Sequence, residues 1–405
     1  MSRLSLSLAC ACILSASASA QVAPGTITKS APSTVFTYGS GGQIPGTGTG
    51  QIAHFRLPHN PLGTWTTCIT VTSGLPSSNG GSGGYDLLMG VYDRVKGKFT
   101  PNLLAANLNS AGNDFGLMLD PKGMYAIFDR ATGVYLASRK NLIAKFNAPV
   151  QVAGITQTYV DPALGYVGGK LKIFYTLNKN IVMQDLDLST PSAPKVSGTP
   201  SIIVQSGATN TANSATPITG PDGDVEGLWF ANLVGRDNDM CWKASLDPKD
   251  PFTVVVDTTT WINNGGVAGG LLTHAGPTNP KNAMYELKAA WLLGDVVSPG
   301  GTADVFGAFP RKNNLPGITA VFLSAGLLKT PVAVAPFTGL FGLDLKTFGY
   351  LSTMTHSDAS DRAKMALPIP NNPSMKGVVV HLQGLSIDPT GKAYTLTNTG
   401  KITVK

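Results

Sequence analysis

Residues 113–139 read NDFGLMLDPKGMYAIFDRATGVYLASR, and this stretch decides the fold. Its acidic residue Asp114 is followed by three short apolar segments separated by two glycine-containing turns. Short apolar segments bounded by such turns are typical of β-strands joined as hairpins. The stretch therefore predicts three antiparallel strands in succession.

The same order of acid, strand, turn, strand, turn and strand recurs along the chain. Further copies read YVDPALGYVGGKLKIFYTLNKNIVMQDLD at residues 159–187 and DVEGLWFANLVGRDNDMCWKASLD at residues 224–247, with partial copies at residues 85–93 and 267–274. A unit of antiparallel strands that recurs at about 50 residues predicts the blades of a β-propeller. We expect an all-β fold, with a propeller of about five blades. A β-sandwich with irregular strand spacing is the alternative that the same turn frequency permits.

The composition supports short strands and excludes several other classes. The 405 residues include 47 Gly and 28 Pro, and only 13% are charged, which disfavours long helices, coiled coils and charge-driven disorder. Lys and Arg number 30 against 23 Asp and Glu, giving a net charge of +7. Because no run of Lys or Arg occurs, we expect no nucleic-acid partner.

The first twenty residues, MSRLSLSLACACILSASASA, are typical of a signal peptide. Arg3 precedes an apolar run that is too short to cross a bilayer, and the Ala-Ser-Ala ending predicts cleavage after Ala20. A lipoprotein signal at Cys10 or Cys12 is the alternative. We expect no membrane span later in the chain and a secreted or periplasmic protein.

Two cysteines, Cys68 and Cys241, remain after such a cleavage. They are expected to be structural thiols or to form one disulfide, and the sequence leaves this open. No His at ligand spacing accompanies either of them, so a zinc site is not expected.

The pattern of the sequence changes after about Glu286. We therefore divide the chain into a signal peptide at residues 1–20, a propeller at 21–285 and a small β-sandwich at 286–405. The run from Leu367 to Gln383 and the later pair Thr397-Asn398 resemble a C-terminal β-sandwich module of exported bacterial proteins. The resemblance implies no catalytic role.

Residues 119–123 (LDPKG) and 134–139 (VYLASR) resemble the TolB-like propeller repeat. In that repeat a D-P-x-G turn separates two strands and an Arg follows the last strand. The resemblance covers one blade well and implies the fold rather than a function.

Three acidic residues stand at the beginning of the repeats: Asp114, Asp161 and Glu226. Carboxylates brought together from successive blades could provide the base, the modulator and the acid of a glycosidase. The patterns around Asp161 and Glu226 resemble the five-bladed glycoside hydrolase superfamily that includes arabinanases and fructan-cleaving enzymes. By that resemblance Asp114 is the base, Asp161 the modulator and Glu226 the general acid. The sequence departs from the family at residues 51–60, QIAHFRLPHN, where an early Asp is expected.

These observations leave two hypotheses for the function. The first is a propeller that binds a polysaccharide or surface glycan in its central channel. The sequence leaves open whether this propeller is also a glycoside hydrolase. The second is a non-catalytic propeller that binds a protein or glycan at the cell surface, in which the acids only cap turns.

Other candidate residues accompany these acids. His54 and His274 are channel candidates, since ring closure brings the first and last blades together. Asp222 and Asp224 lie in a glycine-containing acidic segment that could hold Ca²⁺, and no other cofactor is expected. The five tryptophans are expected to lie mostly in the core.

Overall fold

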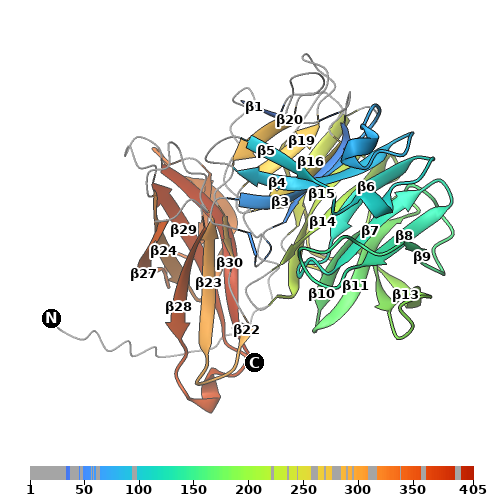
Figure 1. Ribbon diagram of the computed structural model, residues 1–405. Helices are drawn as coiled ribbons and strands as arrows, with labels where there is room; N and C mark the ends of the chain where they lie inside the picture. Colours follow the sequence, from blue (N-terminus) through green and yellow to red (C-terminus); the bar gives the residue numbers. More distant parts are fainter. Residues whose placement is uncertain are drawn as a thin grey trace.

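The computed structural model describes the chain from Ser33 to Lys405 with gaps (Figure 1). The described residues are 33–36, 45, 49–55, 57, 59–60, 64–93, 98–219, 223–234, 237–243, 245–256, 263–268, 271–275, 284–288, 291–293, 296–308, 317–337, 339–356, 362–387 and 394–405. The predicted signal peptide therefore lies outside them. Within these ranges the structure consists of β-strands and three short 3₁₀ turns, η1 (Ser77–Asn79), η2 (Ala106–Leu108) and η3 (Pro373–Met375). The prediction of an all-β chain is confirmed.

Four sheets of four antiparallel strands follow one another along the chain, each with its strands paired in chain order. The first sheet contains β2 (Thr49–Phe55), β3 (Thr64–Val71), β4 (Asp86–Asp93) and β5 (Lys98–Asn102). The second contains β6 (Asp114–Leu119), β7 (Tyr125–Arg130), β8 (Gly133–Ser138) and β9 (Val150–Gln151). The third contains β10 (Ala163–Val167), β11 (Lys170–Leu177), β12 (Asn180–Asp187) and β13 (Lys195–Val204). The fourth contains β14 (Asn210–Thr219), β15 (Val225–Val234), β16 (Asp237–Lys243) and β17 (Thr253–Val256).

A fifth sheet is assembled from both ends of this part of the chain. Its strands are β18 (Asn263–Ala268), β19 (Leu271–Ala275), β20 (Met284–Lys288) and β1 (Ser33–Phe36). The N-terminal strand β1 pairs antiparallel with β20, with Ser33 opposite Glu286. The first strand of the chain therefore completes the last of the five sheets.

The first strand of each sheet contacts the first strand of the next, and β18 contacts β2 in turn. These innermost strands thus contact one another in a ring, which is the arrangement of a β-propeller. The predicted propeller is confirmed. The count of five blades stays a prediction, because several stretches next to the fifth sheet lie outside the described residues.

The sheets are held together by apolar side chains on both of their faces. Between the first two sheets the core includes Leu87, Leu119, Phe128 and Phe146, all fully buried or nearly so. Comparable clusters join the second sheet to the third and the third to the fourth. A single sheet exposes two apolar faces, so each sheet is stable only between its neighbours. Three of the five tryptophans, Trp65, Trp229 and Trp242, are buried as expected.

One repeat begins earlier than the sequence indicated. Residues 224–247 cover β15 and β16, the second and third strands of their sheet, whereas the first strand is β14. Its sequence, NTANSATPIT, has few large apolar residues. It is buried because neighbouring strands surround it, and not because its own pattern is hydrophobic.

The C-terminal part forms two further sheets that share one core. One sheet has the order β21 (Trp291–Leu293), β23 (Thr302–Ala308) and β28 (Arg362–Pro368). The other has the order β22 (Val296–Val297), β30 (Tyr394–Val404), β29 (Val379–Ile387), β24 (Gly317–Ser324) and β27 (Gly349–His356). Leu292, Val305, Val321, Leu382 and Ile402 from both sheets form the buried cluster between them. This is the predicted β-sandwich, which lies beside the propeller in Figure 1.

A hairpin of β25 (Leu327–Ala333) and β26 (Leu340–Leu343) is attached to this sandwich through Gln383. The buried carboxamide of Gln383 accepts the N–H of Gly342 at 2.9 Å. It also donates to the carbonyl oxygens of Leu340 and Thr397 at 2.7 and 2.8 Å. The last residue of the sequence motif at residues 367–383 therefore joins three strands.

Candidate functional site

The innermost strands are irregular near the end of the ring at which they begin, which we call the entrance end. Four of these strands shift register in their pairing with the following strand. The shift lies between Thr49 and Ile52 in β2, and between Phe115 and Met118 in β6. It lies between Asn213 and Thr216 in β14, and between Asn263 and Gly266 in β18. Such irregularities redirect side chains and are frequent at functional sites. The entrance end is therefore the candidate location of a functional site.

A small pocket lies at this end, between the first four sheets. It is lined among others by Gln51 of β2, Gly116 of β6, Asp161 before β10, and Ser214 of β14. Its volume of about 10 Å³ has room for one water molecule. A sugar ring does not fit into it, so a larger ligand would have to lie across its opening.

Asp161 is the charged centre of the pocket. Its Oδ1 accepts a hydrogen bond from Nε2 of Gln51 at 2.5 Å, and its Oδ2 accepts one from Oγ of Ser214 at 2.8 Å. These bonds connect the first, third and fourth sheets. Asp161 and Ser214 have φ angles of +50° and +57°, in the left-handed region that side chains other than Gly rarely adopt. Strained residues gathered at one pocket are typical of a functional site.

Asp129 supports this centre from behind. It lies on β7, is 1% exposed, and accepts the backbone N–H of Asp161 through Oδ2 at 2.8 Å. Burial, and then the negative charge of Asp161, raise the pKa of Asp129 to about 8. The other carboxyl oxygen, Oδ1, is buried and has no hydrogen-bond partner in the described part of the chain.

An aromatic row runs beside the pocket and crosses three sheets. It consists of Tyr85, Phe115 and Tyr159, whose rings meet edge to face with centroids 4.5 and 5.5 Å apart. Tyr159, two residues before Asp161, is 52% exposed. The row therefore offers an aromatic surface to solvent next to the Asp161 carboxylate.

The described loops at the entrance end carry almost no charge. Those at residues 72–85, 103–113, 131–132, 152–162, 178–179 and 205–209 contain Asp161 and Lys179 as their only charged residues. They are rich in Ser, Thr, Asn and Gly instead. The described part of this end thus presents neutral hydrogen-bonding groups.

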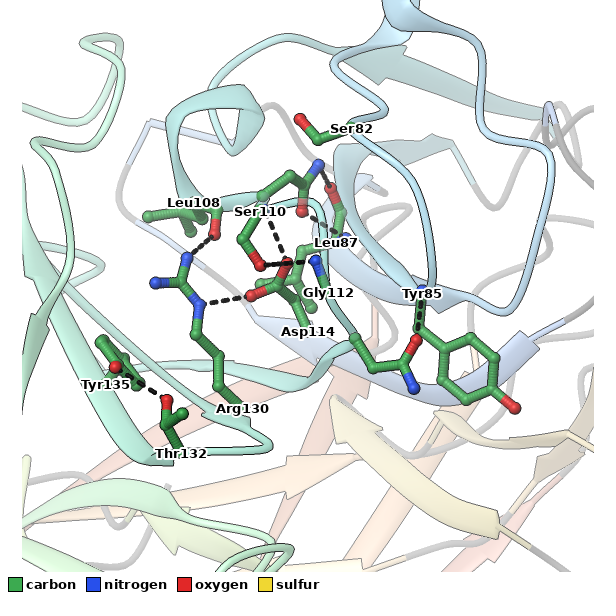
Figure 2. Close-up of polar contacts among 12 residues, drawn as sticks. Ser82, Tyr85, Leu87, Leu108, Ser110, Gly112, Asp114, Arg130, Thr132 and Tyr135 are labelled. Carbon is green, nitrogen blue, oxygen red and sulfur yellow. Dashed lines mark hydrogen bonds and ion pairs between the residues drawn. The ribbon is translucent and has the colours of Figure 1, made fainter.

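Asp114, the predicted base, is not among the residues that line this pocket. Figure 2 shows its carboxylate turned toward Ser110 and Arg130. The carboxylate is fully buried, and its Oδ1 pairs with Nε of Arg130 at 2.5 Å. Its Oδ2 accepts both the backbone N–H and the hydroxyl of Ser110, at 2.7 and 2.9 Å. Asp86 binds the N–H of Ser82 in the same way at the beginning of β4. Both acids hold loops, which is the turn-capping alternative.

Glu226 is not equivalent to the other two acids in the structure. It lies near the beginning of β15, where Gly227 pairs with Ile218 and Val225 with Thr219. Ile218 is four residues beyond Ser214 on β14, roughly 13 Å along the strand. The side chain of Glu226 lies outside what the structure describes. The backbone therefore places Glu226 toward the far end of the ring, away from Asp161.

His54 is a packed residue of the first sheet. Its Nδ1 lies 2.8 Å from Oγ1 of Thr67, and its ring contacts that of Tyr92. Burial lowers the pKa of His54 to about 3, so the ring is neutral at physiological pH. His274 lies on β19, opposite Tyr285, and its side chain lies outside the described residues. His54 thus lies on the first strand of its sheet, and His274 lies on the second strand of another sheet.

Asp224 has a structural role that competes with the calcium hypothesis. Its two carboxylate oxygens accept the N–H groups of Gly168 and Gly169 at 2.6 and 3.1 Å, which fixes the turn between β10 and β11. Asp222 lies outside the described residues. Among the residues with described side chains, no three His, Cys, Asp or Glu gather as metal ligands.

Cys68 and Cys241 are both buried free thiols. They belong to different apolar clusters of the propeller. Burial raises the pKa of each thiol, which removes the reactive thiolate. The two cysteines are therefore structural thiols in this structure and do not form a disulfide.

Comparisons with known proteins assign no family. No family model and no curated protein matches the chain. Among solved structures, the β-propeller domain of Cps50 (Swd1) from Myceliophteria thermophila covers 88% of this chain and 97% of its own, with 8% identity and a TM-score of 0.29. Dimeric latent PorU from Porphyromonas gingivalis covers 88% of this chain and 34% of its own, with 10% identity and a TM-score of 0.21. Both superpositions are too distant to support an argument, so the fold rests on the sheets themselves. No helix in the described ranges has the length and apolar character of a membrane span.

Several residues of the site were not selected from the sequence: Gln51, Tyr85, Phe115, Asp129, Tyr159 and Ser214. Gln51 stands in the stretch where the family resemblance led us to expect an Asp, and this was the one signal available for it. Ser214 lies in the strand whose pattern did not reveal it. The others required the packing of separate sheets.

Proposed function

We propose that this chain is an exported binding protein that takes a neutral glycan across the entrance end of its propeller and does not hydrolyse it. Export follows from the predicted signal peptide. The observation that supports the proposal is the aromatic row with its exposed Tyr159 beside the Asp161 carboxylate, next to described loops in which Lys179 is the only other charged residue.

The chemistry of this surface suits a neutral, hydroxyl-rich ligand. Aromatic rings offer apolar faces and edges that pack against the C–H groups of a sugar. A carboxylate accepts strong hydrogen bonds from hydroxyl groups, and Ser, Thr and Asn side chains add neutral donors and acceptors. A polyanion or polycation would find few charged partners in the described loops. The pocket has room for one water molecule only, so the sugar chain would lie across its opening.

The absence of a second carboxyl group at the pocket supports binding without hydrolysis. Glycosidases generally use two carboxyl groups, separated by about 5–9.5 Å, on either side of the scissile bond. Among the residues that line the described pocket, Asp161 is the only acid, and Gln51 is a carboxamide that cannot act as base or nucleophile. Asp129 is sealed beneath Asp161, and Asp114 is bound to Arg130.

Binding to a panel of neutral plant and microbial polysaccharides, measured by affinity electrophoresis and calorimetry, tests this proposal. Tyr159→Ala and Asp161→Asn should each weaken binding by roughly tenfold, since each removes a contact of about 1.4 kcal/mol. Tyr350→Ala is the matched control, because Tyr350 is 62% exposed and lies on the sandwich. No reducing ends should appear on prolonged incubation.

Two results would contradict the proposal. Unchanged binding in Tyr159→Ala and Asp161→Asn would place the ligand elsewhere, and release of reducing ends that Asp161→Asn abolishes would restore the hydrolase hypothesis. A protein partner is the second candidate, favoured by the exposed Tyr159, since tyrosine is enriched in protein interfaces. If the protein binds none of the polysaccharides tested, a protein partner is favoured.

A further inference from the structure

The turn that carries Asp161 adopts an unfavourable backbone conformation. Tyr159 and Asp161 have φ angles of +57° and +50°, and neither is a glycine. Left-handed residues of this kind persist only when the surrounding structure holds them. Something next to the turn must therefore fix it.

Asp129 is the group in contact with the backbone of this turn. Its Oδ2 accepts the N–H of Asp161 at 2.8 Å, and the N–H of Val160 also points to its carboxyl group. The side chain belongs to β7 in the preceding sheet, so it reaches the turn across the boundary between two sheets. Gln51 and Ser214 bind the Asp161 carboxylate from the other side. Asp161 is thus held through its backbone by one group and through its side chain by two.

The surroundings of Asp129 favour a neutral carboxyl group. Its cross-strand neighbours are Phe115 on β6 and Val134 on β8, which supply no charge. Arg130, the next residue on β7, is paired with Asp114. From the loop before β10, the titratable group that faces it is Asp161, which is negative. Two adjacent carboxylates with no cation between them repel, so one of them retains a proton.

We propose that Asp129 is a buried, proton-bearing positioning residue that holds the Tyr159–Asp161 turn in its left-handed conformation and makes the entrance site sensitive to pH. The inference deepens the proposed function and rests on it only for the effect on the ligand. The neutral carboxyl still accepts the Asp161 N–H through Oδ2. Loss of the proton places a second negative charge beside the Asp161 carboxylate. This repulsion is larger than the gain from either N–H bond to the ionised Asp129, so the turn is displaced. The raised pKa of Asp129, about 8, agrees with this order of events.

The decisive experiment needs no ligand. The backbone amide of Asp161 is followed by NMR in the full chain labelled with ¹⁵N-aspartate, between pH 5 and pH 9.5. In the parent its resonance should move with a midpoint near 8, the pKa of Asp129. In Asp129→Asn, which keeps an oxygen acceptor and has no proton to lose, the same resonance should stay constant. Asp120→Asn is the matched control, because Asp120 is equally buried but binds the turn at Lys122 and Tyr125.

A parent resonance that does not move between pH 5 and pH 9.5 overturns the inference, whether or not any variant folds. A titration that persists in Asp129→Asn overturns it as well. Glycan affinity, measured separately, should fall roughly tenfold in the parent between pH 6 and pH 9 and remain level in Asp129→Asn. If no glycan binds, the proposed function fails while the amide titration still decides the role of Asp129.

Discussion

Gly116 and Gln51 lie closer together than any side chain at position 116 would allow. A Cβ atom on Gly116 would stand 2.3 Å from Oε1 of Gln51, and Gly116 has a φ angle of +70°. The same carboxamide donates to Asp161. The glycine therefore permits the contact between the first and third sheets on which the pocket depends.

Replacement of this glycine should disturb both the backbone and the pocket. Gly116→Ala should cost about 1–2 kcal/mol for the left-handed conformation, and about 1–3 kcal/mol more as Gln51 moves away from Asp161. Gly169→Ala is the control, with a φ angle of +72° and nothing within 4 Å of the added methyl group. Urea unfolding measures both variants. Equal losses of stability would show that the Gln51 contact contributes nothing.

The buried pair of Asp114 and Arg130 should matter for stability and not for ligand binding. Asp114→Asn leaves Arg130, whose side chain is 17% exposed, without its charge partner, and should lower the free energy of unfolding by about 2–3 kcal/mol. Asp187→Asn breaks the exposed pair with Lys195 and should change the stability little. If the Asp114 variant kept its stability but lost the glycan, Asp114 would belong to the binding site.

The stability of the chain should fall as the pH rises from about 4 to about 8, through the contribution of Asp129. The folded state holds a proton on Asp129 up to a pKa of about 8, whereas the unfolded chain releases it near the ordinary pKa of an aspartate, 3.8. Within this window the loss amounts to about 1.4 kcal/mol per pH unit from this group. Urea unfolding at several pH values should show a shallower decline for Asp129→Asn than for the parent. Parallel curves would mean that Asp129 has an ordinary pKa.

Gln383 should be essential for the hairpin of β25 and β26. Gln383→Ala leaves the N–H of Gly342 and two carbonyl groups without their partner, and should cost about 2–3 kcal/mol. The amide of Gly342 should then exchange its hydrogen faster. Gln151→Ala, which removes an exposed bond to Thr132, should change the stability by no more than about 0.5 kcal/mol. Unchanged exchange at Gly342 would show that other contacts hold the hairpin.

The sheet of β6 to β9 was predictable from the sequence because its turns are specified locally. Asp120 accepts the N–H groups of Lys122 and Tyr125, and its carbonyl oxygen accepts that of Gly123. Arg139, which follows β8, donates back to the carbonyl of Gly123 at 2.6 Å. The D-P-x-G turn and the following Arg thus form one local unit, and a local unit leaves a visible pattern.

The candidate site was only partly predictable, since its members come from different sheets. Asp114 and Asp161 look alike in the sequence, as each stands at or just before the beginning of an innermost strand. Asp114 turns toward the donors of Ser110 in its own loop, whereas Asp161 is turned into the pocket by its left-handed backbone. The sequence predicted Glu226 at the beginning of its repeat, but Glu226 lies on the second strand, β15. The first strand, β14, carries small polar residues and was therefore not recognised as a strand. No pattern in one segment distinguishes these cases.

The pairing of β1 with β20 also constrains the order in which the chain acquires its structure. Ser33 emerges early during synthesis, but its partner Glu286 follows only after the strands of four other sheets. Until then β18 to β20 lack an outer neighbour, and β1 has unpaired backbone groups that could associate with another chain. Contacts between such distant segments are slow to form. Closure of the ring is therefore a late step, and a chain shortened before Met284 would retain an unpaired N-terminal strand prone to aggregation.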